Sequence, residues 1–243
     1  MKILLIGFGS IGKRHIDNML SLGYKNISIV SSKPALLNTY SHLKVYSNLQ
    51  QALAGDTFEA AFICSPTAFH IQQMITLIEH KIKFIYVEKP LSHNFESINM
   101  VLQKASTYTN NIVVGFDLRF HPGIQKAKEL ISENAIGEII SVNAFVGQNL
   151  SQWRPYEDYK KGMSSKKETG GGVLLDLIHE FTYLYWLLGH VETVACNTTS
   201  SDDLAIETED AADGLLKFSN GSLGYVLIDY VQHALMRHWV FTG

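Results

Sequence analysis

Short apolar runs alternate with amphipathic segments over the first half of the chain. The apolar runs predict strands at residues 2–6, 27–30, 60–63, 84–87 and 112–114. Apolar positions at helical spacing predict helices over residues 11–22, 68–80 and 95–106. Strands that are apolar throughout are typical of a parallel sheet covered on both faces. We therefore predict an α/β domain over residues 1–120, with the doubly wound parallel sheet of a Rossmann fold.

The pattern of apolar positions changes after residue 120. Helical spacing predicts helices over residues 124–131 and 171–188. Alternating or β-branched runs predict strands at residues 138–146, 191–198, 210–218, 222–230 and 237–242. Asn220-Gly221 favours a hairpin turn between two of these strands. We predict an α+β domain over residues 121–243 with a mainly antiparallel, open sheet.

Composition and charge exclude several classes of function. The net charge of −3 leaves no excess of cations to neutralise nucleic acid or an anionic membrane surface. The 2 cysteines lie outside any CxxC pair, and the 10 histidines form no HExxH motif, so we expect no disulfide framework and no metal. The chain carries no signal-peptide or membrane-span pattern, so we expect a cytoplasmic protein.

A glycine motif follows the first predicted strand and opens the first predicted helix. Its residues are Gly7, Phe8, Gly9, Ser10, Ile11 and Gly12. In this context the first glycine permits a tight turn, the second lets a pyrophosphate approach the backbone, and the third lets helix and strand pack closely. The motif predicts a site for NAD or NADP. The alternative is a glycine turn with a purely structural role.

The end of the second predicted strand bears on the choice of cofactor. An NAD-specific site places Asp or Glu there to accept from the ribose 2′-hydroxyl. This chain has Ser31, Ser32 and Lys33 instead. Two hydroxyls and a cation suit a 2′-phosphate, so we favour NADP over NAD. The alternative is an exposed loop that serves neither cofactor.

Polar residues follow the later strands of the first domain. Ligands bind outside the carboxyl ends of parallel strands, so these segments are expected to meet at one edge. The residues predicted to contact the cofactor there are Cys64, Ser65, Pro66, His70, Glu88, Lys89 and Arg119. Lys89 stands beside a carboxylate at the mouth of a buried strand, where it can hold a substrate hydroxyl or the nicotinamide. The alternative is an ordinary surface lysine.

The apolar helix predicted from residue 171 carries Asp176, His179 and Glu180. Spacings of three and four residues put them near one helix face. Ionisable groups in such a helix are costly unless they are paired or line a polar cleft. We predict that His179 removes the proton of a substrate hydroxyl, because histidine titrates near neutral pH. The alternative is an internal triad without chemistry.

The polar stretch 147–169 is long for a connection without structure, which suggests a functional role. Trp153 and Arg154 within it are candidates for gripping a substrate. We interpret its four lysines as solvated surface, at positions 160, 161, 166 and 167. The predicted substrate contacts are therefore Lys89, Arg119, Trp153, Arg154, Asp176 and His179.

Four further segments, taken with the glycine motif, resemble the pattern of a known protein family. They are Cys64-Ser65-Pro66-Thr67 with His70, Glu88-Lys89-Pro90-Leu91, Gly115-Phe116 with Arg119-Phe120-His121-Pro122, and Gly170 to Asp176. In this order they resemble the Gfo/Idh/MocA oxidoreductases, the glucose–fructose oxidoreductase and inositol dehydrogenase family. The resemblance implies that Lys89 is catalytic and contacts the cofactor. It also implies a sugar-like substrate and a homo-oligomer formed through the C-terminal sheet.

The chain departs from the family pattern in one place. The family places its aspartate four residues before the histidine, whereas Asp176 precedes His179 by three. Aligning the downstream Trp186-Leu187-Leu188-Gly189 matches His179 to the family histidine and leaves open whether Glu180 shares its role. Chains of the family also continue beyond residue 243, so we expect the second domain to be incomplete.

The resulting hypothesis is an NAD(P)-dependent oxidoreductase that acts on a secondary alcohol of a sugar, cyclitol or nucleotide sugar. Lys89, Asp176 and His179 are its predicted catalytic residues. Two alternatives remain at this point. One is a non-catalytic regulator that binds a dinucleotide, and the other is a reductase of the same fold with a non-sugar substrate.

Overall fold

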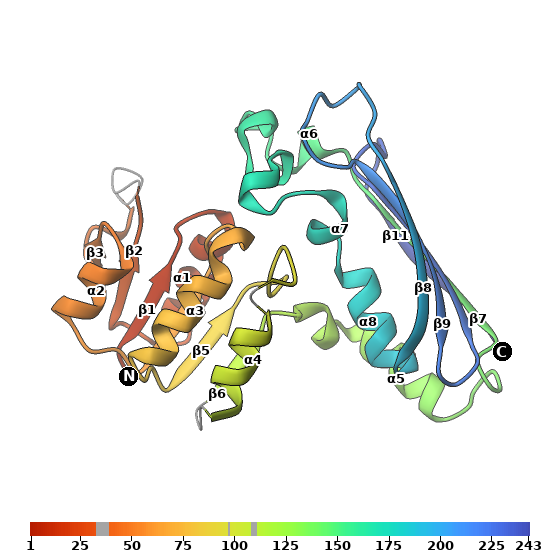
Figure 1. The fold of residues 1–243 in the computed structure, drawn as a ribbon, viewed down its shortest axis with the longest axis horizontal. Coiled ribbons are helices and arrows are strands. Elements are labelled where there is room, and N and C mark those ends of the chain that lie inside the picture. The colour runs from red at the N-terminus through yellow and green to blue at the C-terminus, as the bar shows by residue number, and fades with distance from the viewer. Residues whose placement is uncertain (33–38, 97, 108–110) are drawn as a thin grey trace. The chain divides into compact units, whose positions relative to one another are not determined.

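The computed structural model describes residues 1–32, 39–96, 98–107 and 111–243. The chain forms two compact units, Met1–Gly115 and Phe116–Gly243 (Figure 1). The domain boundary predicted at residue 120 lies at the end of η3 (Asp117–Phe120), a short 3-10 helix in the second unit.

The first unit contains a six-stranded parallel sheet with strand order β3-β2-β1-β4-β5-β6. Its strands are β1 (Ile3–Ile6), β2 (Ile27–Val30), β3 (Lys44–Tyr46), β4 (Ala60–Ile63), β5 (Phe84–Val87) and β6 (Asn111–Val114). The central strand β1 pairs with β2 on one side and with β4 on the other. Strand order therefore reverses at β1, which makes the loop after β1 the switch point where ligands bind in such sheets.

The register aligns the carboxyl ends of the strands. Ile6 lies opposite both Val30 and Ile63, Ile63 lies opposite Val87, and Val87 lies opposite Val114. The segments that leave these strands consequently emerge at one edge of the sheet. This edge, called the carboxyl edge below, holds the glycine motif and the Glu88-Lys89-Pro90 segment.

Helices cover both faces of this sheet. They are α1 (Ser10–Ser21), α2 (Leu49–Gly55), α3 (His70–Glu79) and α4 (Ile98–Thr107), with the short 3-10 helix η2 (Thr67–Phe69) before α3. Ile16 and Met19 of α1 pack with Ile3 and Leu5 of β1. Leu4 and Ile6 point to the other face, where residues of α2, α3 and α4 pack. The doubly wound sheet predicted from the apolar runs is confirmed, whereas β3 and α2 were not predicted because each is short.

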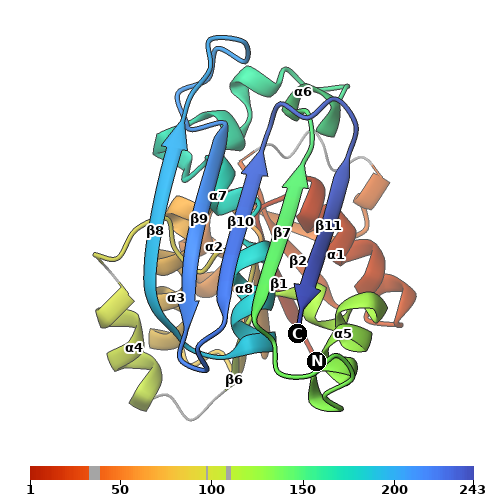
Figure 2. The same ribbon diagram turned by 90° about the vertical axis from the view of Figure 1, so that its right-hand side faces the viewer.

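The second unit contains a five-stranded sheet with order β11-β7-β10-β9-β8 (Figure 2). Its strands are β7 (Ser141–Gly147), β8 (Val191–Thr199), β9 (Ala211–Phe218), β10 (Leu223–Asp229) and β11 (Met236–Thr242). β7 and β10 are parallel, and the other neighbours are antiparallel. The predicted α+β unit with a mainly antiparallel sheet is therefore confirmed. Asn220-Gly221 forms the turn between β9 and β10, as its sequence indicates.

One face of this sheet carries the core of the second unit. Val142, Val226 and Ile228 are buried there together with Tyr183 and Leu184. The helices of the unit are α5 (Pro122–Ser132), α6 (Leu150–Trp153), α7 (Val173–Asp176) and α8 (His179–Leu188). Figure 1 shows α7 and α8 on one side of the strands, and Figure 2 shows the other side with no helix of this unit in front of it.

The prediction of a single helix over residues 171–188 is wrong. The chain forms one turn, α7, and then a separate helix, α8, because Leu177 leaves helical geometry with φ −99° and ψ 25°. α7 contacts β9 and β10, whereas α8 contacts α5 and β7, so each segment docks on different neighbours. Neither glycine nor proline stands at the break, and the sequence therefore carries no local signal of it.

The polar stretch 147–169 is also more ordered than its composition indicates. It contains α6 and the 3-10 helices η4 (Tyr159–Lys161), η5 (Met163–Ser165) and η6 (Lys167–Thr169). Ser164 and Ser165 are buried, and the backbone carbonyl of Ser164 accepts from the Thr208 hydroxyl at 2.9 Å. Because these contacts involve polar groups of a distant loop, they leave no periodic apolar pattern in the sequence.

Candidate functional site

The three glycines of the motif have three different surroundings in the structure. Gly7 has φ +96°, and a Cβ there would lie 2.6 Å from the backbone nitrogen of Ser65. A Cβ on Gly12 would overlap the backbone oxygen of Gly7, so this glycine lets α1 approach β1. A Cβ on Gly9 would have no atom within 4 Å. Gly7 and Gly12 thus serve the fold, whereas Gly9 leaves open space beside the backbone.

That open space lies at the beginning of α1. Gly9 is the N-cap residue, and Ser10 and Ile11 form the first turn of the helix. The first N–H groups of a helix have no partners within it, and with the helix dipole they attract anions. Phe8 packs edge-on against Tyr40 with ring centroids 5.6 Å apart. These residues fit the pyrophosphate of a dinucleotide.

Two alanine variants separate the roles of these glycines. Gly9→Ala is expected to fold like the wild type but to weaken NADP or NAD binding, because its methyl group fills the open space. Gly12→Ala is expected to lower the free energy of unfolding by about 1–3 kcal/mol, because its methyl group meets a backbone carbonyl. Calorimetric melting and titration with each dinucleotide measure both effects. Equal cofactor affinity in Gly9→Ala and the wild type would contradict this interpretation of Gly9.

The end of β2 carries the residues that favour NADP. Ser31 is buried, and its backbone N–H donates to the carbonyl of Tyr46 at 3.1 Å. Ser32 is exposed, and Lys33 lies outside the described residues. No carboxylate stands at positions 31–33, where an NAD-specific site places one. The preference for NADP therefore stays a prediction.

The end of β4 supplies the next predicted cofactor residues. Cys64 is buried, and burial raises the pKa of its thiol, so Cys64 is not a nucleophile at neutral pH. The Ser65 hydroxyl donates to the side-chain oxygen of Gln73 at 2.6 Å, and Pro66 precedes η2. The ring of His70 lies between the backbone carbonyls of Ser65 and Pro90, at 2.9 Å from each. This strand end therefore contacts the Glu88-Lys89-Pro90 segment through His70.

Glu88 is held from two sides at the end of β5. Its Oε1 lies 2.7 Å from Nε2 of His15, on α1, and accepts from the Tyr86 hydroxyl at 3.0 Å. Its Oε2 accepts from the Lys89 backbone N–H at 3.3 Å. Burial raises the pKa of Glu88, but these partners outweigh burial and lower the pKa below its usual value. Glu88 is therefore ionised at neutral pH.

The contacts of the first unit bring most of its predicted cofactor residues together at the carboxyl edge. Gly7 leaves no room for a Cβ beside the Ser65 backbone, α1 contacts Glu88 through His15, and His70 contacts both Ser65 and Pro90. Sequence reasoning missed Tyr86 as a partner of Glu88. In the structure Gly115 leaves room for Tyr86, since a Cβ there would overlap the Tyr86 hydroxyl. Whether each of these residues touches the cofactor stays a prediction.

The second unit holds the predicted acid–base residues. His179 begins α8, and its Nε2 lies 3.5 Å from a carboxylate oxygen of Asp117. Asp176 ends α7, and its Oδ2 accepts from the Tyr230 hydroxyl at 2.6 Å. Burial and the charge of Asp176 raise the pKa of Tyr230 well above its ordinary value, so this hydroxyl stays protonated. Asp176 and His179 thus come from two helices, and both side chains are largely buried.

Glu180, the next residue of α8, contacts β11. Its side chain is 0% exposed, and its Oε1 accepts from Nε of Arg237 at 2.7 Å. Its Oε2 lies 3.5 Å from Nη2 of the same arginine. A carboxylate bound on both oxygens by one guanidinium serves as an anchor between α8 and β11. This contact favours a structural role for Glu180 over a share in the role predicted for His179.

Three further predicted substrate residues lie in the second unit. Trp153 packs edge-on against Tyr230, with ring centroids 5.3 Å apart, and so lies close to the Tyr230–Asp176 hydrogen bond. Its indole N–H is buried and has no hydrogen-bond partner among the described residues. The guanidinium of Arg119 lies 5.5 Å from the Phe116 ring, and Arg154 is half-buried. A ligand with acceptor groups suits the free indole donor of Trp153.

Sequence reasoning missed Tyr230 and Asp117 in this unit. Tyr230 follows the end of β10, where nothing in the local pattern marks it. Asp117 directly follows the Gly115-Phe116 motif, which is the only signal for it. Among the described residues, no three His, Cys, Asp or Glu side chains are grouped so as to hold a metal ion. Over the same residues, no helix is long and apolar enough to cross a membrane.

Two family models match the chain and together cover most of it. One describes an oxidoreductase family with an NAD-binding Rossmann fold and matches residues 1–116. The other describes the GFO/IDH/MocA C-terminal domain and matches residues 124–242.

Curated relatives are similar over most of this chain. The uncharacterized oxidoreductase YrbE of Bacillus subtilis is 28% identical over 232 residues, which cover 91% of this chain and 65% of that protein. The myo-inositol 2-dehydrogenase of Thermotoga maritima is 25% identical over 238 residues, which cover 93% of this chain and 67% of that protein. The chain thus spans about two thirds of the length of these relatives.

Solved structures share the fold of the whole chain. The WlbA dehydrogenase from Bordetella pertussis, solved in complex with NADH and UDP-GlcNAcA, matches with a TM-score of 0.89 and 22% identity. The match covers 100% of this chain and 71% of that one. At this identity the likeness concerns the fold alone.

Proposed function

Because this chain belongs to the Gfo/Idh/MocA family of NAD-binding oxidoreductases, we propose that it transfers a hydride between a nicotinamide cofactor and a sugar-like substrate. The reacting group is a secondary alcohol or the corresponding ketone of a sugar, cyclitol or nucleotide sugar. The observation that carries the proposal is the glycine turn. Gly7 and Gly12 allow close approach of backbone segments there, and Gly9 leaves space at the start of α1.

Residues of the carboxyl edge would hold the dinucleotide. The N-terminal turn of α1 faces the pyrophosphate, and Ser31 and Ser32 face the ribose at the end of β2. Ser65 follows β4 and Lys89 follows β5, and both strands end in register with β1. When bound, the nicotinamide accepts or returns the hydride.

The protein residues supply the proton chemistry and the orientation of the substrate. His179 takes the proton of the substrate hydroxyl during oxidation and returns it during reduction. Asp176, fixed by the Tyr230 hydroxyl, orients the reacting group, and the Lys89 ammonium binds a substrate hydroxyl. Trp153 and Arg154 bind the remainder of the substrate together with Arg119, which lies near the start of the second unit.

A thermal-shift panel of NAD, NADP, polyols and nucleotide sugars tests the proposal. A ligand that binds only the folded state raises the melting temperature. We expect a larger shift with NADP than with NAD, because no carboxylate stands at residues 31–33. Binding of a dinucleotide without turnover of any polyol or nucleotide sugar would favour a regulator. Turnover of a non-sugar carbonyl or imine would favour a different reductase of this fold, and no shift with either dinucleotide would refute the proposal.

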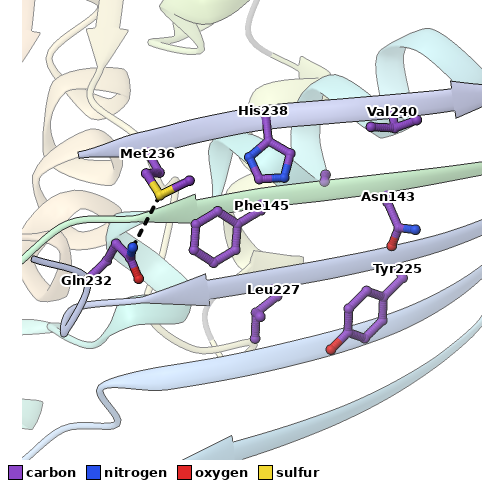
Figure 3. A pocket seen from close by; sticks show the side chains of 9 residues that line it. Asn143, Phe145, Tyr225, Leu227, Gln232, Met236, His238 and Val240 are labelled. Atoms are coloured by element: carbon purple, nitrogen blue, oxygen red, sulfur yellow. Dashed lines mark hydrogen bonds between the residues drawn. The ribbon is translucent and has the colours of Figure 1, made fainter. Parts of the chain in front are cut away.

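We also propose that the second unit forms a homo-oligomer through the sheet face opposite α7 and α8, in which a second copy covers this face. Apolar side chains are exposed there, among them Leu215 at 56%, Val240 at 59% and Tyr225 at 36%. Phe145 and His238 line a shallow hollow in the same face, with rings 5.4 Å apart (Figure 3). Strand spacing and rise give this face roughly 24 by 23 Å, a flat area of about 550 Å², or about two thirds of the roughly 800 Å² per partner of a standard interface.

Leu215→Lys tests this interface. Placing a charge among the apolar side chains of the face is expected to shift the protein from dimer or larger oligomer to monomer. Leu22→Lys is the matched control, since Leu22 is 75% exposed but lies at the end of α1 in the first unit. Sedimentation equilibrium measures the mass of each. A monomeric wild type would refute the proposal.

A further inference from the structure

His70 joins two loops of the carboxyl edge. It is the first residue of α3, and its side chain is 1% exposed. Its Nδ1 lies 2.9 Å from the carbonyl oxygen of Pro90, and its Nε2 lies 2.9 Å from that of Ser65. Ser65 follows β4, whereas Pro90 follows Lys89 at the end of β5. The ring therefore links the loop after β4 to the turn that carries Lys89.

The number of protons on the ring limits these two contacts. A backbone carbonyl only accepts hydrogen bonds, and a neutral imidazole has one N–H and one lone pair. Burial lowers the pKa of His70 below its ordinary value and outweighs the two carbonyls and Glu88, which favour the charged ring. His70 is thus neutral near pH 7. It donates to one carbonyl, while its lone pair faces the other.

The surroundings of the two carbonyls differ. Pro90 is buried, whereas Ser65 is half-buried. An unpaired carbonyl costs more free energy in a buried position, because water does not replace the lost hydrogen bond. A proton on Nδ1, the nitrogen that faces Pro90, therefore stabilises the folded protein more than a proton on Nε2.

We infer that His70 is a positioning residue whose Nδ1–H tautomer fixes the Lys89-Pro90 turn. This inference rests on the proposed function of Lys89. The residue before Lys89 is fixed as well, because Glu88 is bound by His15 and by the Tyr86 hydroxyl. Lys89 thus stands between two anchored neighbours, one held from α1 and one from α3. Such support orients a functional side chain without touching the ligand.

The tautomer is measured directly by NMR of the wild-type protein labelled with ¹⁵N in its histidine rings, at pH 7 and without cofactor. The two neutral tautomers differ in which ring nitrogen carries the proton and therefore in their nitrogen shifts. We expect the protonated nitrogen of His70 to be Nδ1. Protonation at Nε2, or on both nitrogens, would overturn the inference. This measurement does not depend on any cofactor or substrate.

Two amide variants test the consequence for function. The side-chain nitrogen of asparagine occupies the place of Nδ1, and that of glutamine the place of Nε2. His70→Asn is expected to keep the bond to Pro90 and to bind NADP more tightly than His70→Gln. His70→Gln is expected to keep only the bond to Ser65 and to bind NADP about 10-fold more weakly, with a corresponding loss in kcat.

The comparison of the two variants separates positioning from general stability. Each variant keeps one of the two contacts. Calorimetric melting identifies a temperature at which both variants are folded, and the comparison is made there. Equal NADP dissociation constants for the two variants, or weaker binding by His70→Asn, would overturn the positioning role. A wild type that binds neither NADP nor NAD would instead refute the proposed function, and the NMR tautomer would still decide which carbonyl His70 holds.

Discussion

Replacing His179 by alanine is expected to lower kcat by about 100- to 10,000-fold, the usual contribution of a general acid or base. The physical reason is that the substrate hydroxyl loses the group that takes its proton. Lys89→Met is expected to have an effect of similar size, because it removes the ammonium and keeps the length of the side chain. The rate of NADP or NAD reduction with the sugar identified by the ligand panel measures both.

Cofactor binding and a control lysine show whether the loss is specific. His179→Ala is expected to bind the dinucleotide with nearly wild-type affinity, because the glycine turn is unchanged, whereas Lys89→Met is expected to bind it more weakly, because Lys89 is a predicted cofactor contact. Lys167→Ala is the control, since Lys167 is exposed in the polar stretch that the sequence assigned to solvated surface. Its turnover is expected to equal that of the wild type. Wild-type rates in both His179→Ala and Lys89→Met would defeat the assignment of these residues.

Arg237→Met is expected to destabilise the second unit by about 3–5 kcal/mol, because it removes the guanidinium that binds the buried Glu180 carboxylate. All 3 tryptophans, Trp153, Trp186 and Trp239, lie in this unit, so their fluorescence during urea unfolding reports its stability alone. The unit is expected to unfold at a lower urea concentration in the variant than in the wild type.

Two controls establish that the buried charge causes this loss. The double variant Glu180→Leu/Arg237→Met is expected to recover most of the stability, because apolar groups then replace both members of the pair. Lys126→Ala removes a pair with Glu129 in which both side chains are more than half exposed, and is expected to cost less than about 1 kcal/mol. A loss in Arg237→Met no larger than in Lys126→Ala would contradict the anchoring role.

Local sequence pattern predicted the elements that carry the site. The glycine motif needs only a strand before it and a helix after it, and the structure has both at β1 and α1. Apolar runs likewise located β4 and β5, and with them the segments at Ser65 and Lys89. These features were predictable because strand burial and the glycine turn depend on residues close together in the chain.

Local pattern was wrong for the helix that carries the predicted acid–base residues. A continuous helix would place Asp176, His179 and Glu180 near one face, and the apolar residues between them support one. In the structure α7 and α8 dock on different neighbours, and Glu180 turns to Arg237 while Asp176 receives the Tyr230 hydroxyl. The energetic reason for the break lies in the packing of two segments, which no local propensity records.

The sequence by itself determined the fold class, the glycine turn and the segments that follow each strand of the first sheet. Only the tertiary structure decided which side chains those segments bind. His15 reaches Glu88 across 73 positions of the chain, Arg237 reaches Glu180 across 57, and Tyr230 reaches Asp176 across 54. Such pairs leave no periodic pattern, because a single buried polar contact depends on where two distant elements meet and not on the residues around either partner.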